Sequence, residues 1–493
     1  MCIMNERNLT LMTDLYELTM MQGYFENGSD DLVVFDAFYR SNPSGSGYAI
    51  CCGLEQVIEY VKNLHFSDGD IEYLRSLNLF GEPFLEYLKN FRFTGDIYAI
   101  PEGTVIFPNE PLVKVVAPIM QAQLLEPALL NIINHQSLIA TKASRVCYAA
   151  EGDGIMEFGL RRAQGPDAGV YGARAAVIGG CVGTSNVLAG QMFGVPVKGT
   201  HAHSWIMSFP DELTAFRTYA KLYPNACILL VDTYNTLKSG VPHAIQVFQE
   251  MREAGIPLTF YGIRLDSGDL AYLSKQAREM LDAAGFPDAV ISASCDLDEY
   301  LIASLKDQGA AITSWGVGTN LITSKDCPAF GGVYKLAAIY DKKNARFVPK
   351  IKRSENPEKI TNPGNKIIYR IYNKESGKII GDLLALHNET FSEERNLMIF
   401  DPVHTWKKTY LEAGTFTLRK LLVPVFKGGE CVYKSPSVME IRDICRDELN
   451  TLWDETRRFR NPHEVYIDLS RKLYNVKYHL LDQMNTFLEE ADQ

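Results

Sequence analysis

Residues 226–270, "ACILLVDTYNTLKSGVPHAIQVFQEMREAGIPLTFYGIRLDSGDL", contain the pattern that decides the fold. One short apolar run ends at Asp232 and a second ends at Asp266. Between them, residues 240–255 place apolar side chains three positions apart and end on a glycine, which is typical of an amphipathic helix with a glycine at its C-terminus. The stretch therefore predicts a strand, a covering helix and a second strand parallel to the first.

The same unit recurs over residues 155–340, at steps of roughly 20 to 35 residues, as expected for a strand, a helix and two loops. Seven or more such units favour an irregular (β/α) barrel, and an open doubly wound sheet is the alternative. In both folds, functional side chains gather at the carboxyl ends of the strands. The polar ends of the seven runs are Arg161, Thr184-Ser185-Asn186, His203-Ser204, Asp232, Asp266-Ser267, Asp296 and Gly318-Thr319.

The flanks of this repeat predict two further parts, which fits the number of domains expected for 493 residues. Residues 1–128 mix strand-like and helical runs and are expected to form an N-terminal α+β domain. The α/β barrel, with the active site, is assigned to residues 129–340. Residues 341–493 contain a small β unit and helices and are expected to pack on the N-terminal domain as a C-terminal extension.

The bulk composition excludes several classes of partner. The net charge is −11 and no large Lys/Arg cluster exists, so nucleic acid is not expected as a partner. No apolar signal core begins the chain and no stretch of ~20 apolar residues occurs, so no membrane span is expected. Ten cysteines without a C-x-x-C pair favour a reduced, cytoplasmic protein.

Two of the nine histidines, His201 and His203, lie in a run that reads as a strand, "VPVKGTHAHS". Residues two apart on a strand share one side of the sheet, so the pair could be half of a metal site. The only other histidine of the repeat region, His243, falls inside a predicted helix, which disfavours that interpretation. The alternatives are one chemically active imidazole beside a bystander, or two structural ones.

The carboxylates Asp232, Asp266 and Asp296 end three successive strands and are expected to converge. Carboxylates at such a place can bind Mg²⁺, hold ribose hydroxyls or orient an imidazole, and a single one can instead cap a helix. Asp269 is the stronger candidate for a helix cap. The loops "RLDSGDL" and "GVGTNL" could cradle an anion with backbone N–H groups, or could be tight turns that need glycine.

The segment "FGLRRAQGPDAG" closes one strand with Phe158 and two arginines. Arginine pairs with phosphate or carboxylate and an aromatic ring can stack on a flat substrate, whereas an ion pair at the rim is the structural alternative. Taken with "LMTDLYELTM", "GTSN", "GTHAHSW", "LLVDTYNT", "RLDSGD", "WGVGT", "GGVYKL" and "NPHEVYIDLSRKLYN", the chain resembles the nicotinate phosphoribosyltransferases, which are type II phosphoribosyltransferases.

The resemblance implies that nicotinate and phosphoribosyl pyrophosphate give nicotinate mononucleotide and pyrophosphate, with coupled ATP hydrolysis and Mg²⁺. It also implies a homodimer with shared active sites. His203 matches the histidine that ATP phosphorylates, because the family pattern has Gly-Thr, two variable residues and His-Ser. His201 falls on a variable position. Asp232 matches the carboxylate that hydrogen-bonds the imidazole, and Phe158 with the partner subunit's Tyr16 matches the pair around the pyridine ring.

The remaining matches concern the phosphoribosyl group and its anions. They are Arg161, Arg264, Asp266, Ser267, Gly268, Asp296, Gly318 and Thr319, with Lys335 and Arg40 toward pyrophosphate. Ser204 is a candidate nicotinate contact, and Asp266 with Asp296 are candidate Mg²⁺ ligands. The nearest alternative is a nicotinamide phosphoribosyltransferase; a quinolinate-specific relative ranks lower. An amidohydrolase-like metalloenzyme would need more histidines, and a non-enzymatic barrel would not need three convergent aspartates.

Overall fold

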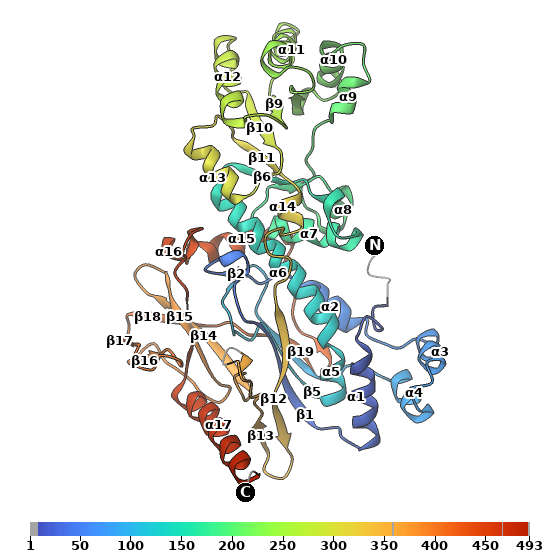
Figure 1. The fold of residues 1–493 in the computed structure, drawn as a ribbon, viewed down its shortest axis with the longest axis vertical. Helices are drawn as coiled ribbons and strands as arrows, with labels where there is room; N and C mark the ends of the chain where they lie inside the picture. Colours follow the sequence, from blue (N-terminus) through green and yellow to red (C-terminus); the bar gives the residue numbers. More distant parts are fainter. Residues whose placement is uncertain (1–7, 357–358, 466, 492–493) are drawn as a thin grey trace. The chain divides into compact units, whose positions relative to one another are not determined.

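The computed structural model describes residues 8–356, 359–465 and 467–491, with side chains up to Gln483. The chain forms two compact units, and Figure 1 labels many of their helices and strands. Unit 2 comprises residues 139–328 and 438–442, and unit 1 comprises the rest. The fold is mixed α/β, with parallel strands in unit 2 and mainly antiparallel ones in unit 1. Among the described helices, none is long and apolar enough to cross a membrane.

The centre of unit 2 is a six-stranded parallel sheet. Nearly all of its strand residues are buried, as expected for a sheet covered by helices. Gly262 allows close packing of two neighbouring strands, because a Cβ there would lie 2.0 Å from the Val290 carbonyl oxygen. In spatial order the strands are β7 (Gly183–Thr184), β6 (Gly154–Glu157), β11 (Ser314–Val317), β10 (Val290–Ser294), β9 (Tyr261–Leu265) and β8 (Cys227–Leu230).

Several helices of unit 2 begin or end where the sequence signals predict. Asp269 caps α12 by accepting a hydrogen bond from the Tyr272 N–H, and Gly255, Gly285 and Gly309 follow helices with positive φ. The helices are α7 (Pro166–Ile178), α8 (Val187–Phe193), α9 (His203–Met207), α10 (Glu212–Leu222), α11 (Val241–Glu253), α12 (Leu270–Ala283), α13 (Glu299–Asp307) and α14 (Thr319–Ile322), with short turns at Leu160–Arg162, Pro224–Ala226 and Thr236–Gly240.

The parallel strand–helix alternation is confirmed, but the sheet does not close into a barrel. Its order leaves β7 and β8 at opposite ends. The run "VPVKGTHAHS", predicted as the strand between them, contributes only an isolated bridge of Val197 to Thr184. The bridge is confined to Val197; residues 198–202 form a loop, and His203 begins α9. The two histidines therefore do not share the face of a strand.

Unit 1 is built on a seven-stranded antiparallel sheet. Strand β1 (Leu32–Tyr39) pairs with β12 (Gly332–Asp341) on one side and β5 (Val113–Pro118) on the other, so segments distant in sequence form one sheet. The other strands are β13 (Arg346–Pro349), β3 (Asp96–Ala99), β19 (Val423–Lys427) and β20 (Glu430–Cys431).

Unit 1 also contains a four-stranded sheet and two small strand pairs. The sheet runs β18 (Phe416–Lys420), β14 (Lys366–Asn373), β15 (Ile379–Leu386) and β21 (Ile467–Leu469); the pairs are β16 (Leu397–Phe400) with β17 (Lys408–Leu411), and β2 (Ala49–Ile50) with β4 (Val105–Ile106). The helices are α1 (Leu15–Glu26), α2 (Leu54–Lys62), α3 (Asp68–Ser76), α4 (Glu82–Lys89), α5 (Ile119–Leu124), α16 (Asp454–Arg457) and α17 (Arg471–Ala491), with a turn at Pro43–Gly45. Two helices run from one unit into the other, α6 (Glu126–Ala149) and α15 (Val438–Asn450).

The observed division differs from the expected one at both borders of the barrel region. Residues 329–340 belong to unit 1, because β12 pairs with β1. Residues 129–138, which lie within α6, also belong to unit 1. The C-terminal segment joins the N-terminal one directly, because β19 pairs with β3.

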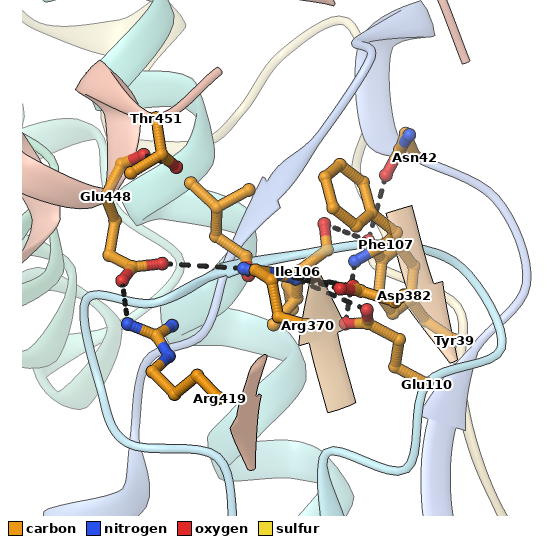
Figure 2. A network of polar contacts seen from close by, with 11 residues as sticks. Tyr39, Asn42, Ile106, Phe107, Glu110, Arg370, Asp382, Arg419, Glu448 and Thr451 are labelled. Carbon is orange, nitrogen blue, oxygen red and sulfur yellow. Dashed lines mark hydrogen bonds and ion pairs between the residues drawn. The ribbon is translucent and has the colours of Figure 1, made fainter. Parts of the chain in front are cut away.

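A buried ionic network fastens these two segments of unit 1 together (Figure 2). The Arg370 guanidinium on β14 has no solvent exposure; its Nη2 is 2.7 Å from an Asp382 oxygen on β15 and 3.3 Å from Glu110. Its Nη1 donates to the Val105 carbonyl at 2.6 Å and lies 3.4 Å from Glu448 on α15. One side chain thus links β4, a loop, two strands and a helix.

The two inner carboxyls of this network hold different charge states. Burial, together with the neighbouring Asp382, raises the pKa of Glu110 well above its usual range. Burial also acts to raise the pKa of Asp382, but the Arg370 charge and hydrogen bonds from Arg370 and Glu110 lower it overall. Glu110 is therefore the neutral partner, and Asp382 is the carboxylate that balances Arg370.

This assignment predicts opposite outcomes for two amide substitutions. Asp382→Asn leaves Arg370 buried without its counterion and is expected to destabilise unit 1 by about 3–5 kcal/mol. Glu110→Gln keeps a neutral hydrogen-bonding group of the same shape and is expected to cost less than about 1 kcal/mol. Urea unfolding of both variants tests this, and equal losses would contradict the assignment.

Candidate active site

A cavity of about 390 Å³ lies in unit 2, at the carboxyl ends of its parallel strands. Its wall combines three arginines and two aspartates with one phenyl ring and several glycines and hydroxyl groups, which suits a polar, anionic ligand with a flat part. The lining residues are Phe158, Arg161, Arg162, Ser185, Gly199, Thr200, His201, Ala202, Arg264, Asp266, Ser294, Cys295, Asp296, Gly316, Gly318 and Thr319.

Most of the site residues that the sequence predicts in unit 2 line this cavity. Seven of them line the cavity: Phe158, Arg161, Arg264, Asp266, Asp296, Gly318 and Thr319. His203, Ser204, Asp232, Ser267 and Gly268 are absent from its wall but lie on α9 or directly after β8 and β9. Tyr16, Arg40 and Lys335 belong to unit 1 and are described separately below.

Arg264, on β9, is the most constrained cation of the cavity. Its Nη1 donates to the Thr200 hydroxyl and, at 3.2 Å, to the His201 carbonyl; its Nη2 lies 3.7 Å from Asp266. Burial lowers the pKa of this guanidinium, while Asp266 and Asp232 act in the opposite direction. Its Nε is buried without a hydrogen-bond partner among the described residues. The side chain is fixed, and its charge is only partly balanced.

Asp232 and His203 form the second feature of the site. The Asp232 Oδ2 accepts from the Asp266 N–H at 2.8 Å and the Ser267 hydroxyl at 2.7 Å. Its Oδ1 is buried and has no donor within the described ranges, and it lies 3.9 Å from His203 Nε2. The oxygen nearest Nε2 is instead Asp266 Oδ2, at 3.7 Å.

These distances exceed a hydrogen bond, so the expected Asp232–imidazole bond is not formed in this structure. His203 Nδ1 is instead 3.0 Å from the Thr233 hydroxyl. The His203 side chain is 39% exposed, so the ring is accessible at the end of the sheet.

Two neighbours define the surroundings of Phe158. Glu157 holds the backbone that follows it, and Gly316 leaves room for the Phe158 ring. The buried Glu157 side chain, at the end of β6, accepts hydrogen bonds from the Gly159 N–H and the Thr184 hydroxyl. Burial raises the pKa of Glu157, and these two hydrogen bonds act against that rise. A Cβ on Gly316 would lie 2.5 Å from the Phe158 ring, so the ring rests on bare backbone. The aromatic wall is thus held by both neighbours.

The loop after β10 is strained, which is frequent at functional sites. Cys295 and Asp296 both have positive φ, 147° and 30°. The Asn320 side chain holds the loop by donating to the Asp296 and Leu297 carbonyls, at 2.7 and 3.1 Å. Burial, followed by the nearby aspartates, raises the pKa of the Cys295 thiol, so this cysteine is not an activated nucleophile.

The three candidates of unit 1 lie in different surroundings. Tyr16 on α1 is 48% exposed. Lys335 on β12 donates to the Tyr334 carbonyl at 2.6 Å and lies 3.6 Å from Glu126. Arg40 follows β1, with its guanidinium 5.9 Å from the Phe38 ring centre. Unit 1 thus carries two cationic candidates, Lys335 and Arg40, and one candidate with an exposed ring, Tyr16.

Several lining residues were not among those matched to a substrate role, although they lie in or beside the strand-end segments. Thr200 belongs to "GTHAHS", Ser185 to "GTSN" and Ser294 to the run before Asp296. Ser294 donates a hydrogen bond to Asp266, so it orients that carboxylate. A small hydroxyl residue at a strand end carries no distinctive signal by itself, because the same residues are frequent in tight turns.

Comparison with protein families places these features in a known class. Three domain descriptions match in chain order: the nicotinate phosphoribosyltransferase N-terminal domain over residues 11–134, the nicotinate phosphoribosyltransferase family over 154–373, and the C-terminal domain over 365–477. The α/β fold with this strand-end cavity is that of a phosphoribosyltransferase.

The chain belongs to the nicotinate phosphoribosyltransferase family. It is 46% identical to the nicotinate phosphoribosyltransferase of Bacillus subtilis (strain 168), over 98% of this chain and 97% of the relative. The crystal structure of human nicotinic acid phosphoribosyltransferase matches with a TM-score of 0.83 and 29% identity, over 95% of this chain and 99% of that one. These matches confirm the predicted enzyme class, nicotinate phosphoribosyltransferase, and its place in NAD salvage.

A more distant structure supports the fold alone. The nicotinate-nucleotide pyrophosphorylase from Pyrococcus furiosus matches with a TM-score of 0.69 at 23% identity, over 90% of this chain and 97% of that one.

Glu17, the residue after Tyr16, makes the folding stability depend on pH. Glu17 has no solvent exposure; one oxygen accepts from Gln123 at 2.6 Å, and the other has no partner in the described part of the chain. Burial raises the pKa of Glu17 to about 7. The folded state thus keeps a proton that the unfolded chain loses near pH 4.5, and stability falls as the pH rises from about 4.5 to about 7.

Glu17→Gln should therefore stabilise the protein at pH 8, by on the order of 2 kcal/mol, and have little effect at pH 4.5. Thermal unfolding at the two pH values measures the difference. Glu26→Gln, at an exposed position of the same helix, is the control and should show no such pH dependence. A Glu17→Gln gain that is equal at both pH values would refute the buried-charge explanation.

Proposed function

We propose that the enzyme couples ATP hydrolysis to nicotinate phosphoribosyl transfer through phosphorylation of His203. Nicotinate, phosphoribosyl pyrophosphate, ATP and water give nicotinate mononucleotide, pyrophosphate, ADP and phosphate. The observation that carries the proposal is the environment of the His203 ring, an accessible imidazole whose two nitrogens face different partners. His201, two residues earlier, is buried.

The geometry favours Nδ1 of His203 as the nucleophilic nitrogen. Nε2 faces Asp266 and Asp232 at 3.7 and 3.9 Å, and two carboxylates favour a proton on the nitrogen between them. That proton leaves the lone pair on Nδ1, where the Thr233 hydroxyl donates to it. In the phosphorylation step, the Nδ1–P bond forms while the bond from the γ-phosphorus to the ADP oxygen breaks. Water later cleaves the Nδ1–P bond and releases phosphate.

Phosphoribosyl pyrophosphate is assigned to the cavity wall formed by β9, β10 and β11. Arg264 supplies an incompletely balanced cation, and Gly268, with φ of +81°, lets the "RLDSGD" loop turn closely around an anion. Ser267 donates to Asp232, so it is oriented by the carboxylate behind His203. The proposed contacts are Arg161, Arg264, Asp266, Ser267, Gly268, Asp296, Gly318 and Thr319.

Mg²⁺ is proposed to bind with the substrate, with Asp266 and Asp296 as the candidate ligands. The residues fit this ion: Asp266 lines the cavity with oxygen ligands, and the neighbouring Asp232 carries an oxygen without a donor in the region described. No group of three or more acidic, His or Cys side chains is placed to hold a metal among the described residues. Mg²⁺ often needs only one or two carboxylates beside substrate phosphates, and it would neutralise the departing pyrophosphate.

Nicotinate is assigned to the aromatic wall at Phe158, with Ser204 as a further polar contact. The partner subunit's Tyr16 would cover the other face of the ring in a homodimer with shared sites. The half-exposed ring on α1 agrees with that role. Lys335 and Arg40 are proposed to reach the pyrophosphate.

The chemistry requires little acid–base assistance from the protein. The pyridine nitrogen carries a lone pair and attacks C1′ as the bond to pyrophosphate breaks, so no proton must leave the nucleophile. The barrier lies in the charge that develops on the ribosyl carbon and on the leaving group. Fixed cations such as Arg264 lower this barrier because they are oriented before the reaction starts. We also place the enzyme in the reducing cytoplasm, in keeping with free thiols at all nine cysteines of the described residues.

Isotope labelling tests the phosphorylation directly. Incubation with γ-³²P-labelled ATP followed by peptide mapping should place the label on His203, and His203→Ala should abolish the label and the ATP stimulation while retaining some ATP-independent transfer. The matched variant His201→Gln should still be labelled. Label on His201, or unlabelled wild-type protein, would disprove the proposal.

The aromatic wall gives a second test. Gly316→Ala would push the Phe158 ring out of place and is expected to raise the KM for nicotinate by roughly tenfold, because the stacking surface is displaced. Gly199→Ala is the control within the same cavity, since a Cβ there meets nothing within 4 Å. Steady-state kinetics with varied nicotinate separates them, and an unchanged KM in Gly316→Ala would remove Phe158 from the nicotinate site.

A further inference from the structure

His201 is the histidine that the phosphorylation proposal leaves without a role. Its ring is 9% exposed, between the Val197 bridge and the start of α9. It meets the Tyr219 ring edge-on, with ring centres 4.6 Å apart, and Phe216 lies farther away, at 6.4 Å. The residue also lines the cavity. A polar ring inside an aromatic cluster and beside a substrate cavity calls for a specific partner.

That partner is the backbone of β8. The Leu230 N–H donates to His201 Nε2 at 3.3 Å, and Leu230 is the last residue of β8, just before Asp232 and Thr233. Nε2 can accept only if it carries a lone pair, so the proton of the neutral ring lies on Nδ1. The imidazole therefore ties its loop to the strand end that delivers the groups around His203.

The ring stays neutral under assay conditions. Burial lowers the pKa of His201 to about 4, against a hydrogen bond with the Ala202 backbone that raises it. The Arg264 charge and the neighbouring His203 ring act in the same direction as burial, and Tyr219 is a further titratable group that faces the ring. Because Nε2 is occupied and the ring is covered, His201 is a poor phosphoryl acceptor.

The backbone of the same segment holds the main cation of the cavity. The His201 carbonyl and the Thr200 hydroxyl both accept hydrogen bonds from Arg264 Nη1. The loop has no regular secondary structure there, so its place depends on such contacts. The His201 ring anchors it to β8, and its carbonyl positions the Arg264 guanidinium from β9.

We propose that His201 is a positioning residue for phosphoribosyl pyrophosphate: its neutral imidazole anchors the loop that aims Arg264 at the anionic substrate. The proposal rests on the assignment of Arg264 to that substrate. Loss of the anchor leaves the Leu230 N–H buried and unpaired and frees the loop, so Arg264 loses two fixed acceptors.

The experiment compares His201→Phe with His201→Gln. Phenylalanine keeps a ring against Tyr219 but cannot accept a hydrogen bond, and it is expected to raise the KM for phosphoribosyl pyrophosphate by roughly tenfold with a smaller change in kcat. Glutamine offers an amide oxygen as the acceptor and should restore most of the affinity. Both are assayed without ATP, so that the result does not depend on phosphorylation.

Phe216→Leu is the matched control, because it disturbs the same aromatic cluster and leaves the acceptor in place. It should lower the melting temperature without raising the KM for phosphoribosyl pyrophosphate. If Phe216→Leu raises that KM as much as His201→Phe does, or if His201→Phe leaves it unchanged, the positioning role is overturned.

Arg264→Lys separates this proposal from the one it rests on. An unchanged KM for phosphoribosyl pyrophosphate in Arg264→Lys would overturn the assignment of Arg264 itself, and the positioning role with it. If Arg264→Lys raises the KM, the double variant with His201→Phe should show less than the sum of the two single effects in free energy, because both act on one contact. Fully additive effects would overturn the coupling.

Discussion

The buried guanidinium of Arg370 is the constraint on which the architecture of unit 1 depends. A charge without solvent exposure is tolerated only with a counterion and a full set of hydrogen-bond acceptors, and here these come from Asp382, Glu110, Glu448 and the Val105 carbonyl (Figure 2). The acceptors belong to segments separated by more than 250 residues. The network therefore joins the N-terminal and C-terminal segments of unit 1 through a single side chain.

The active site in unit 2 follows a different logic, in which polar groups are left incompletely satisfied. Asp232 uses one oxygen to hold the Asp266 loop and keeps the other without a donor among the described residues. Arg264 is similarly fixed at Nη1, and its Nε has no hydrogen-bond partner in the part of the chain that the structure describes. Such groups cost stability in the free enzyme and are suited to a ligand that brings the missing charge. The two imidazoles differ in the same respect. His201 is buried and accepts a hydrogen bond, whereas His203 is accessible.

The sequence predicted what depends on local pattern. Parallel strands, glycine-terminated helices, the Asp269 cap and the gathering of Phe158, Arg264 and Asp266 at one sheet end all follow from periodicity and chain direction. It failed where long-range pairing decides. "VPVKGTHAHS" has the composition of a strand, but only Val197 finds a partner. Likewise, the sequence of β12 resembles a further strand of the repeat, but this strand pairs with β1. The local sequence around Arg370 does not indicate its distant hydrogen-bond acceptors.

The division of the chain also bears on the order of events during synthesis. Strand β1 is made early, but its partner β12 emerges almost 300 residues later, after the whole of residues 139–328. Until then, one long edge of β1 has unpaired N–H and C=O groups, which is the state in which sheets aggregate or pair wrongly. Unit 2, by contrast, has nearly all of its residues in one continuous segment. The emerging chain therefore completes the catalytic sheet before the seven-stranded sheet to which β1 belongs.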